Sequence, residues 1–140
     1  MGRILGVDYG EKRIGLAVSD PTGFLATPLD ILDATQPRVV ERLLDLCRER
    51  DIHEVVVGLP LNMDGSTGPQ AKRVQDFAQK LRAALPDRII RTWDERLTSR
   101  AGERVLIEAG ASRKRRREVL DKLAAQIMLQ SYLDAHGPES

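Results

Sequence analysis

The chain has 140 residues, a formal net charge of +1, a hydrophobic fraction of 41% and a charged fraction of 31%. This balance is typical of one ordinary globular domain and excludes an intrinsically disordered chain. The single cysteine excludes an intrachain disulfide, and no apolar run reaches the roughly 18 residues that a membrane span needs. We therefore expect one domain over residues 1–136 and a loose tail over 137–140. We also expect a protein without a secretory leader or a membrane partner, located in the reducing cytoplasm.

The first part of the chain predicts antiparallel strands. Arg3–Tyr9 is apolar on both faces, and a tight turn at Gly10–Lys12 joins it to a second strand, Arg13–Asp20. Phe24–Leu32 is a third strand, and Pro28 places it at a sheet edge because proline cannot donate to a ladder.

The rest of the chain alternates helices and strands. Apolar spacing and turn residues predict the helices Pro37–Arg50, Gln70–Leu85, Thr98–Ala109 and Glu118–Ala135 and the strands Glu54–Gly58 and Arg88–Trp93. A hairpin followed by β-α-β alternation predicts the α/β class, with a mixed five-stranded sheet and helices on both faces.

An acid interrupts the apolar opening strand at Asp8. The period of two places Asp8 on the face that also carries Gly6, and the second strand offers the small residues Gly15 and Ala17. An isolated ionised carboxylate in a dry interior costs several kcal/mol. Asp8 therefore needs a cation, a set of donors or a place at the rim of the sheet.

Two further acids lie near predicted core elements. Asp94 and Glu95 follow a strand, where ligands of such sheets gather, although a solvated strand end is the simpler interpretation. Asp121 stands beside the stripe of the last helix that we expect to face the core, formed by Leu120, Leu123, Ala124 and Ile127. Ala125 and Met128 continue the row of Asp121, which places this acid at the buried edge of the stripe. The small Ala124 and Ala125 would let the helix approach the sheet and bring Asp121 toward Asp8, although an acid favoured by the helix dipole is the alternative.

Three carboxylates from distant segments could thus converge on a hard divalent cation. Mg²⁺ takes oxygen ligands, and two such ions about 3.5–4 Å apart serve phosphodiester hydrolysis. His53 and His136 are the only histidines, which leaves no zinc constellation, and Cys47 falls on a core stripe.

Basic residues offer contacts for a polyanion. The run Arg113, Lys114, Arg115, Arg116 and Arg117 opposes the dipole at a helix start, which favours a binding role over a merely solvated helix entrance. Lys12 and Arg13 flank the turn beside Asp8, and Arg96 is a further candidate. In the loop Pro60–Pro69, Asn62 and Ser66 could donate to phosphate, or the loop is a long turn built on Asp64-Gly65.

Four motifs in order resemble the YqgF/RuvX family: GVDYGEKRIGLAVSD, VVGLPLNMDGSTGPQA, WDERLTS and DKLAAQIMLQSYL. The resemblance implies a ribonuclease H-like fold and a nuclease dependent on Mg²⁺ or Mn²⁺, with two ions held by the catalytic residues Asp8, Glu95 and Asp121. It also implies either 5′-end maturation of the precursor of 16S rRNA, with ribosome-assembly particles as partners, or Holliday junction resolution on branched DNA, for which a homodimer would suit.

Two other functions stay open at this point. A sugar-kinase or actin-type ATP-binding fold also places an Asp among glycines at its first hairpin, but it needs two related domains, and this chain shows no repeat. A non-catalytic RNA-binding factor for ribosome assembly could carry the same acids without using them.

Overall fold

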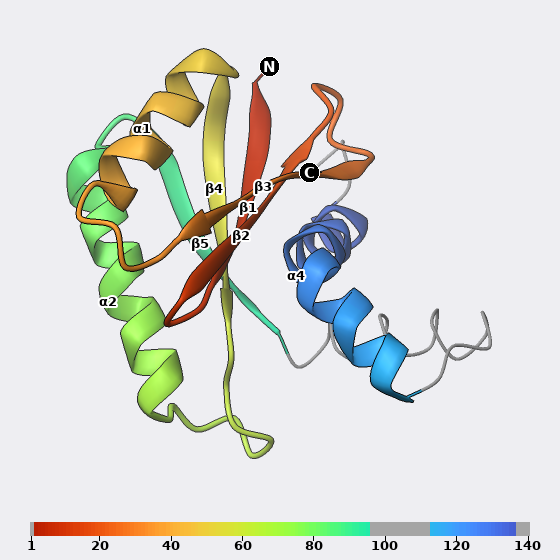
Figure 1. The fold of residues 1–140 in the computed structure, drawn as a ribbon. Coiled ribbons are helices and arrows are strands. Elements are labelled where there is room, and N and C mark those ends of the chain that lie inside the picture. The colour runs from red at the N-terminus through yellow and green to blue at the C-terminus, as the bar shows by residue number, and fades with distance from the viewer. Residues whose placement is uncertain (1, 96–112, 137–140) are drawn as a thin grey trace.

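The computed structural model describes residues 2–95 and 113–136, with the side chains of the last helix described from residue 123 onward (Figure 1). Its elements in chain order are β1 (Arg3–Tyr9), β2 (Arg13–Ser19), β3 (Ala26–Asp33), α1 (Val39–Glu49), β4 (Ile52–Leu59), α2 (Pro69–Ala84), β5 (Ile89–Asp94) and α4 (Arg113–His136). The expected helix Thr98–Ala109 lies outside the described residues.

The strands form one five-stranded mixed sheet in the order β3-β2-β1-β4-β5. β2 pairs antiparallel with both β1 and β3, whereas β4 pairs parallel with β1 and with β5. The predicted α/β class and strand arrangement are confirmed. β3 is an edge strand as expected, and its register shifts beside Pro28, which lies opposite Ala17.

Helices cover both faces of the sheet, as predicted. α1 and α2 lie on one side and α4 on the other (Figure 1). The period of two divides β1 between them: Leu5 and Val7 belong to the core under α1 and α2, while Ile4 packs with the core under α4. The apolarity of both faces of the central strands follows from this three-layer arrangement. In the described part of the chain, no helix is long and apolar enough to cross a membrane.

The buried face of α4 differs from the predicted stripe. Its buried side chains are Ala125, Met128, Leu129, Tyr132 and Leu133. Leu123, Ala124 and Ile127 are only half-buried, and the Leu120 side chain is not described. The predicted stripe was therefore wrong by about one position around the helix. α4 also begins at Arg113, five residues before the predicted start at Glu118, so the basic run is helical.

Glycines in β1 and β2 explain which face α4 buries. A Cβ atom on Gly6 would lie 2.8 Å from Leu129 Cβ, so β1 has room for Leu129 only because Gly6 has no side chain. A Cβ atom on Gly15 would lie 3.5 Å from Ala125 Cβ. The expected close approach of an alanine-bearing helix to a face of small residues is confirmed, with Ala125 at the contact.

A buried polar contact fixes α4 on the sheet. The Tyr132 hydroxyl donates to the carboxylate of Glu54 on β4, which is 8% exposed. Arg91 on β5 forms an ion pair with the same carboxylate at 3.3 Å. Burial and the Glu54 carboxylate raise the pKa of Tyr132 above its usual range, so the hydroxyl keeps its proton.

Trp93 packs beside this contact. Its ring meets the Tyr132 ring edge to face, with centroids 5.4 Å apart, and its indole N–H donates to Ser131 Oγ at 3.3 Å. Trp93 is half-buried and packs against the core under α4.

Candidate active site

Asp8 lies near the carboxyl end of the central strand β1, on the face covered by α4. It is half-buried and pairs with Gly15 of β2. A Cβ atom on Gly15 would lie 3.8 Å from Asp8 Cβ and 3.5 Å from Ala125 Cβ. Asp8 is therefore at the rim of the sheet beside α4, which is one of the three situations expected for a carboxylate in this strand.

Glu95 follows the last residue of β5 and reaches Asp8. Its backbone N–H donates to Leu59 O at 3.0 Å, which extends the ladder between β4 and β5 by one residue. Its side chain lies over Gly58 of β4, and its carboxyl group is hydrogen-bonded to the Asp8 carboxylate. Two of the three predicted acids are thus in direct contact, although they lie 87 positions apart in the sequence.

The surroundings of Glu95 favour its neutral form. Burial raises the pKa of Glu95 to about 8, with further contributions from the charge of Asp8, from the hydrogen bond to Asp8 and from the charge of Asp94. At neutral pH and without a cation, the protonated Glu95 carboxyl donates to Asp8, because two adjacent carboxylates repel each other when both are ionised. Strongly shifted acids in such a position are common in catalytic sites.

Asp121 belongs to α4, but its side chain lies outside the described part of the helix. It precedes Ala125 by one helical turn, and Ala125 lies beside Gly15, the cross-strand partner of Asp8. Ala125 and Met128, which continue the row of Asp121 at intervals of four and seven residues, are buried as expected, and Tyr132 continues the row at eleven. Among the described residues, no group of three or more acids, histidines or cysteines lies close enough to hold a metal ion.

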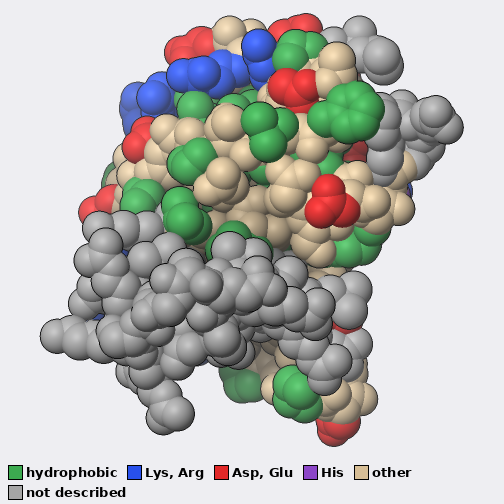
Figure 2. All heavy atoms as spheres, turned by 90° about the vertical axis from the view of Figure 1, so that its right-hand side faces the viewer, with side chains coloured by type: hydrophobic (Ala, Val, Ile, Leu, Met, Phe, Trp, Pro, Cys, Tyr) green, Lys and Arg blue, Asp and Glu red, His purple; other side chains and the backbone are tan. Residues whose placement is uncertain are grey.

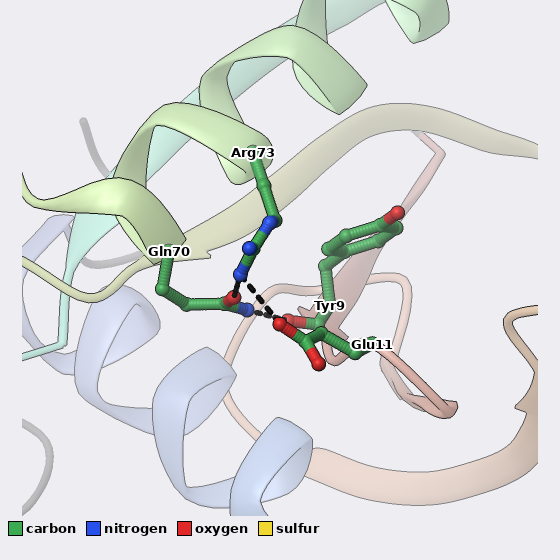
Figure 3. Close-up of polar contacts among 4 residues, drawn as sticks. All are labelled: Tyr9, Glu11, Gln70 and Arg73. Carbon is green, nitrogen blue, oxygen red and sulfur yellow. Dashed lines mark hydrogen bonds and ion pairs between the residues drawn. The ribbon is translucent and has the colours of Figure 1, made fainter.

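The turn that follows Asp8 is fastened to the start of α2. Figure 3 shows Gln70 and Arg73 of α2 pointing toward the turn, with Gln70 Nε2 donating to Tyr9 O at 3.3 Å. Arg73 pairs with Glu11 and also donates to Gln70 Oε1 at 3.1 Å. Arg73 and Glu11 are exposed, so their ion pair adds at most about 1 kcal/mol. These contacts give the carboxyl end of β1 a second support besides the sheet.

The loop between β4 and α2 is held by its own side chains. Asn62 Nδ2 donates to Ser66 Oγ at 2.9 Å, and Ser66 Oγ donates to Asp64 Oδ1 at 2.6 Å. The turn centres on Gly65, whose φ of 88° favours glycine. The expected turn at Asp64-Gly65 is present. The phosphate contacts expected of Asn62 and Ser66 stay a prediction, and in this conformation the Ser66 hydroxyl proton is directed to Asp64.

The predicted basic contacts are placed only in part. Lys12 and Arg13 are exposed at the turn after β1. Arg96 lies outside the described residues, as do the side chains of the run from Arg113 to Arg117, which forms the first part of α4. Figure 2 shows the α4 side of the molecule, where the described Lys and Arg side chains gather along an upper edge and acidic and hydrophobic side chains are scattered.

Gly58 also belongs to the site, although the sequence patterns did not indicate it as a site residue. Gly58 ends the apolar run of β4, and the Glu95 side chain lies directly over it. The signal in the sequence is a glycine that follows Val55, Val56 and Val57 inside a central strand, where a β-branched residue would be usual.

Comparison with known proteins places these observations in a family. A family model described as "RuvX: Holliday junction resolvase" matches residues 2–135. A protein of Pelotomaculum thermopropionicum named "Putative pre-16S rRNA nuclease" is 48% identical over 137 residues, covering 96% of this chain and 88% of the relative. A protein of Syntrophomonas wolfei with the same name is 50% identical over 133 residues, covering 94% of each chain.

Two solved protein structures share this fold, and one of them is a complex with nucleic acid. The structure titled "T. thermophilus RuvC in complex with Holliday junction substrate" matches with a TM-score of 0.61 at 15% identity, covering 97% of this chain and 96% of RuvC. A second structure of Thermus thermophilus RuvC matches with a TM-score of 0.59 at 16% identity. At this level of identity the likeness establishes a shared ribonuclease H-like fold.

Proposed function

This chain belongs to the RuvX family, and we propose that it is a metal-dependent nuclease that hydrolyses phosphodiester bonds in the precursor of 16S rRNA. The observation that carries the proposal is the contact between Asp8 and Glu95, which gathers two acids from β1 and the end of β5 at one point. The names of the relatives, which are 43–50% identical, support precursor rRNA as the substrate.

The two acids suit a hard divalent cation. Carboxylate oxygens are the ligands that Mg²⁺ and Mn²⁺ prefer. Burial and mutual repulsion disfavour full ionisation of the pair, and a cation between the two groups would remove that repulsion. We propose Asp121 as the third ligand, because it lies one turn before Ala125 on the helix that covers Asp8. We also propose that the site binds two metal ions.

Each residue has a distinct task in this proposal. A divalent ion held by these acids would lower the pKa of an attacking water and stabilise charge on the leaving oxygen. Asp8, rooted in the central strand, holds its carboxylate at a fixed place on the sheet. Glu95 would have to lose its proton to hold a cation, so its raised pKa should make the affinity for the cation rise with pH.

Nucleic acid is the proposed partner, bound by Lys12, Arg13, Arg96 and the basic run at the start of α4. Because the chain has a net charge of only +1, its attraction to a polyanion must come from such local groups. We further propose that the protein acts in the cytoplasm on ribosome-assembly particles, where precursor rRNA is processed.

Hydrolysis of Holliday junctions is the second candidate, since the family model is described as a resolvase. A homodimer would then present two active sites to two strands. Cleavage assays with Mn²⁺ on a precursor 16S rRNA fragment and on a four-way DNA junction separate the two substrates. We expect faster cleavage of the rRNA precursor, and preferential cleavage of the junction would replace the first candidate with the second.

Substitution of the acids tests the mechanism. We expect Asp8→Asn, Glu95→Gln and Asp121→Asn each to lower the cleavage rate by at least about a thousandfold, because each removes a proposed ligand. Cooperative thermal unfolding should show that each variant still folds, and excess EDTA should stop the wild-type reaction. A variant that retains wild-type turnover shows that its acid is not a ligand, and cleavage in EDTA excludes the metal mechanism.

The same variants distinguish an enzyme from a binding factor. If the protein only binds RNA during ribosome assembly, Asp8→Asn should restore growth and rRNA maturation to a deletion strain as well as the wild type does. We expect the Asp8→Asn variant to fail in that assay while it still binds RNA.

A further inference from the structure

Glu95 and Asp8 come from strands that are not neighbours. In the order β3-β2-β1-β4-β5, strand β4 separates β5 from β1. Neighbouring strands lie about 4.8 Å apart, so the backbones that carry these acids are separated by roughly 10 Å. To reach Asp8, the Glu95 side chain must therefore cross the face of β4.

The crossing point on β4 is Gly58. Its pairing partner on β5 is Trp93, and the pairing of Val57 with Val7 places Gly58 beside Asp8 on the other side. A Cβ atom on Gly58 would lie 2.2 Å from Glu95 Oε1, 2.9 Å from Cδ and 3.0 Å from Cγ. Any side chain at this position would occupy the path of the glutamate.

The backbone at this position does not itself require glycine. Among the described residues, the glycines with positive φ are Gly23 and Gly65, so Gly58 has a conformation that other residues adopt. Glycine in a strand interior is normally unfavourable. Its presence in the central strand β4 is therefore explained by the space it leaves for Glu95.

We infer that Gly58 is a positioning residue for the metal centre, because it leaves open the passage through which the Glu95 carboxylate reaches Asp8. The inference rests on the proposed metal-dependent function. The backbone of Glu95 is held by the hydrogen bond from its N–H to Leu59 O. A side chain at position 58 would therefore displace the Glu95 carboxylate and leave the backbone in place. The atoms that a methyl group would meet belong to the end of a flexible side chain, so the fold can accept it.

Gly58→Ala tests this inference through Mn²⁺ binding, measured by isothermal titration calorimetry on the full chain. We expect the affinity to fall about 10–100-fold, as for other residues that orient metal ligands. The thermal midpoint of the metal-free variant should stay within a few degrees of the wild type or rise, since Ala restricts the unfolded chain.

Gly15→Ala is the matched control. Gly15 flanks Asp8 on the other side, in β2, and a Cβ atom there would make ordinary contacts of 3.5 Å with Ala125 Cβ and 3.8 Å with Asp8 Cβ. We expect this variant to bind Mn²⁺ as the wild type does. Equal losses in the two variants would show a general effect of crowding beside Asp8 and overturn the specific role of Gly58.

A second background separates positioning from a structural effect. In a Glu95→Ala chain there is no carboxylate to displace, so adding Gly58→Ala should cause no further loss of Mn²⁺ affinity. A further loss of the same size would contradict the inference. If the wild type binds no Mn²⁺, the proposed metal centre fails and the inference fails with it. If the wild type binds Mn²⁺ and Gly58→Ala binds it equally well, the inference alone is wrong.

Discussion

Glu95 shows how its surroundings set the chemistry of one side chain. A solvated glutamate is ionised at neutral pH, whereas burial and the nearby charge of Asp8 raise the pKa of Glu95 to about 8. At neutral pH and without a metal ion, Glu95 therefore keeps its proton. In the proposed function, a cation bound at this site would take the place of that proton.

The shifted pKa predicts how stability depends on pH. The folded pKa lies above the ordinary value of 4.5, so between these two values the native state binds more protons than the unfolded state. For the metal-free wild type, the contribution of Glu95 to the free energy of unfolding is full below about pH 4.5 and is lost as the pH rises to about 8. At about 1.4 kcal/mol for each unit of pKa, the loss amounts to a few kcal/mol.

Urea unfolding in EDTA at several pH values measures this loss. Glu95→Gln is the comparison, since its neutral amide can still donate to Asp8. We expect the two proteins to have similar stability near pH 5 and the variant to be more stable above pH 8. Parallel curves over this range would show that Glu95 does not titrate as described.

Helix α4 illustrates how an element obtains its orientation. A stripe of leucine, alanine and isoleucine beside Asp121 looks apolar enough to face the core, yet the buried row is the one through Ala125 and Tyr132. Gly6 and Gly15 accept that row at close range, and Glu54 receives the Tyr132 hydroxyl. Small residues on the sheet and one buried hydrogen bond therefore decide the rotation of the helix about its axis.

Tyr132→Phe tests this anchor. The variant keeps the ring but leaves the buried Glu54 carboxylate without its hydroxyl donor, so we expect the free energy of unfolding to fall by about 1–3 kcal/mol. Urea unfolding measures the change. In a Glu54→Ala background the same substitution should cost much less, and an equal cost in both backgrounds would assign the effect to packing instead.

At the scale of the whole molecule, a nearly neutral protein is proposed to bind a polyanionic substrate. Acids and bases balance to a net charge of +1, so no general field attracts nucleic acid. Five consecutive basic residues begin α4, on the opposite side of the sheet from α1 and α2 (Figure 1). Affinity for the substrate should accordingly depend on this run and on the turn after β1.

Neutralising the run from Arg113 to Arg117 with glutamine should weaken RNA binding and flatten its dependence on salt. For each phosphate that the variant no longer neutralises, the slope of log K against log salt should become shallower by about 0.7–0.9. Fluorescence anisotropy at several salt concentrations measures the slope. Neutralising Arg42 and Arg48, which are exposed on α1, is the control and should leave the slope unchanged. An unchanged slope in the first variant would remove the run from the interface.

Local patterns were sufficient to predict the strands and the helices on both faces, and they singled out Asp8 as an acid in an apolar strand. Alternation in β1 and the β-branched run of β4 depend only on neighbouring residues, and a carboxylate among apolar residues is conspicuous wherever it occurs. The boundaries of β4 and α4 differ from the predicted ones by a few residues, because pairing and packing extend an element beyond its strongest pattern.

Contacts between distant segments depend on the assembled sheet. No local pattern shows that Glu95 crosses β4 at Gly58 to meet Asp8, because that path exists only once three strands lie side by side in register. Likewise, which row of α4 is buried depends on the glycines that face it. Periodicity records how apolar a face is, whereas the space available on the opposing surface decides which face fits.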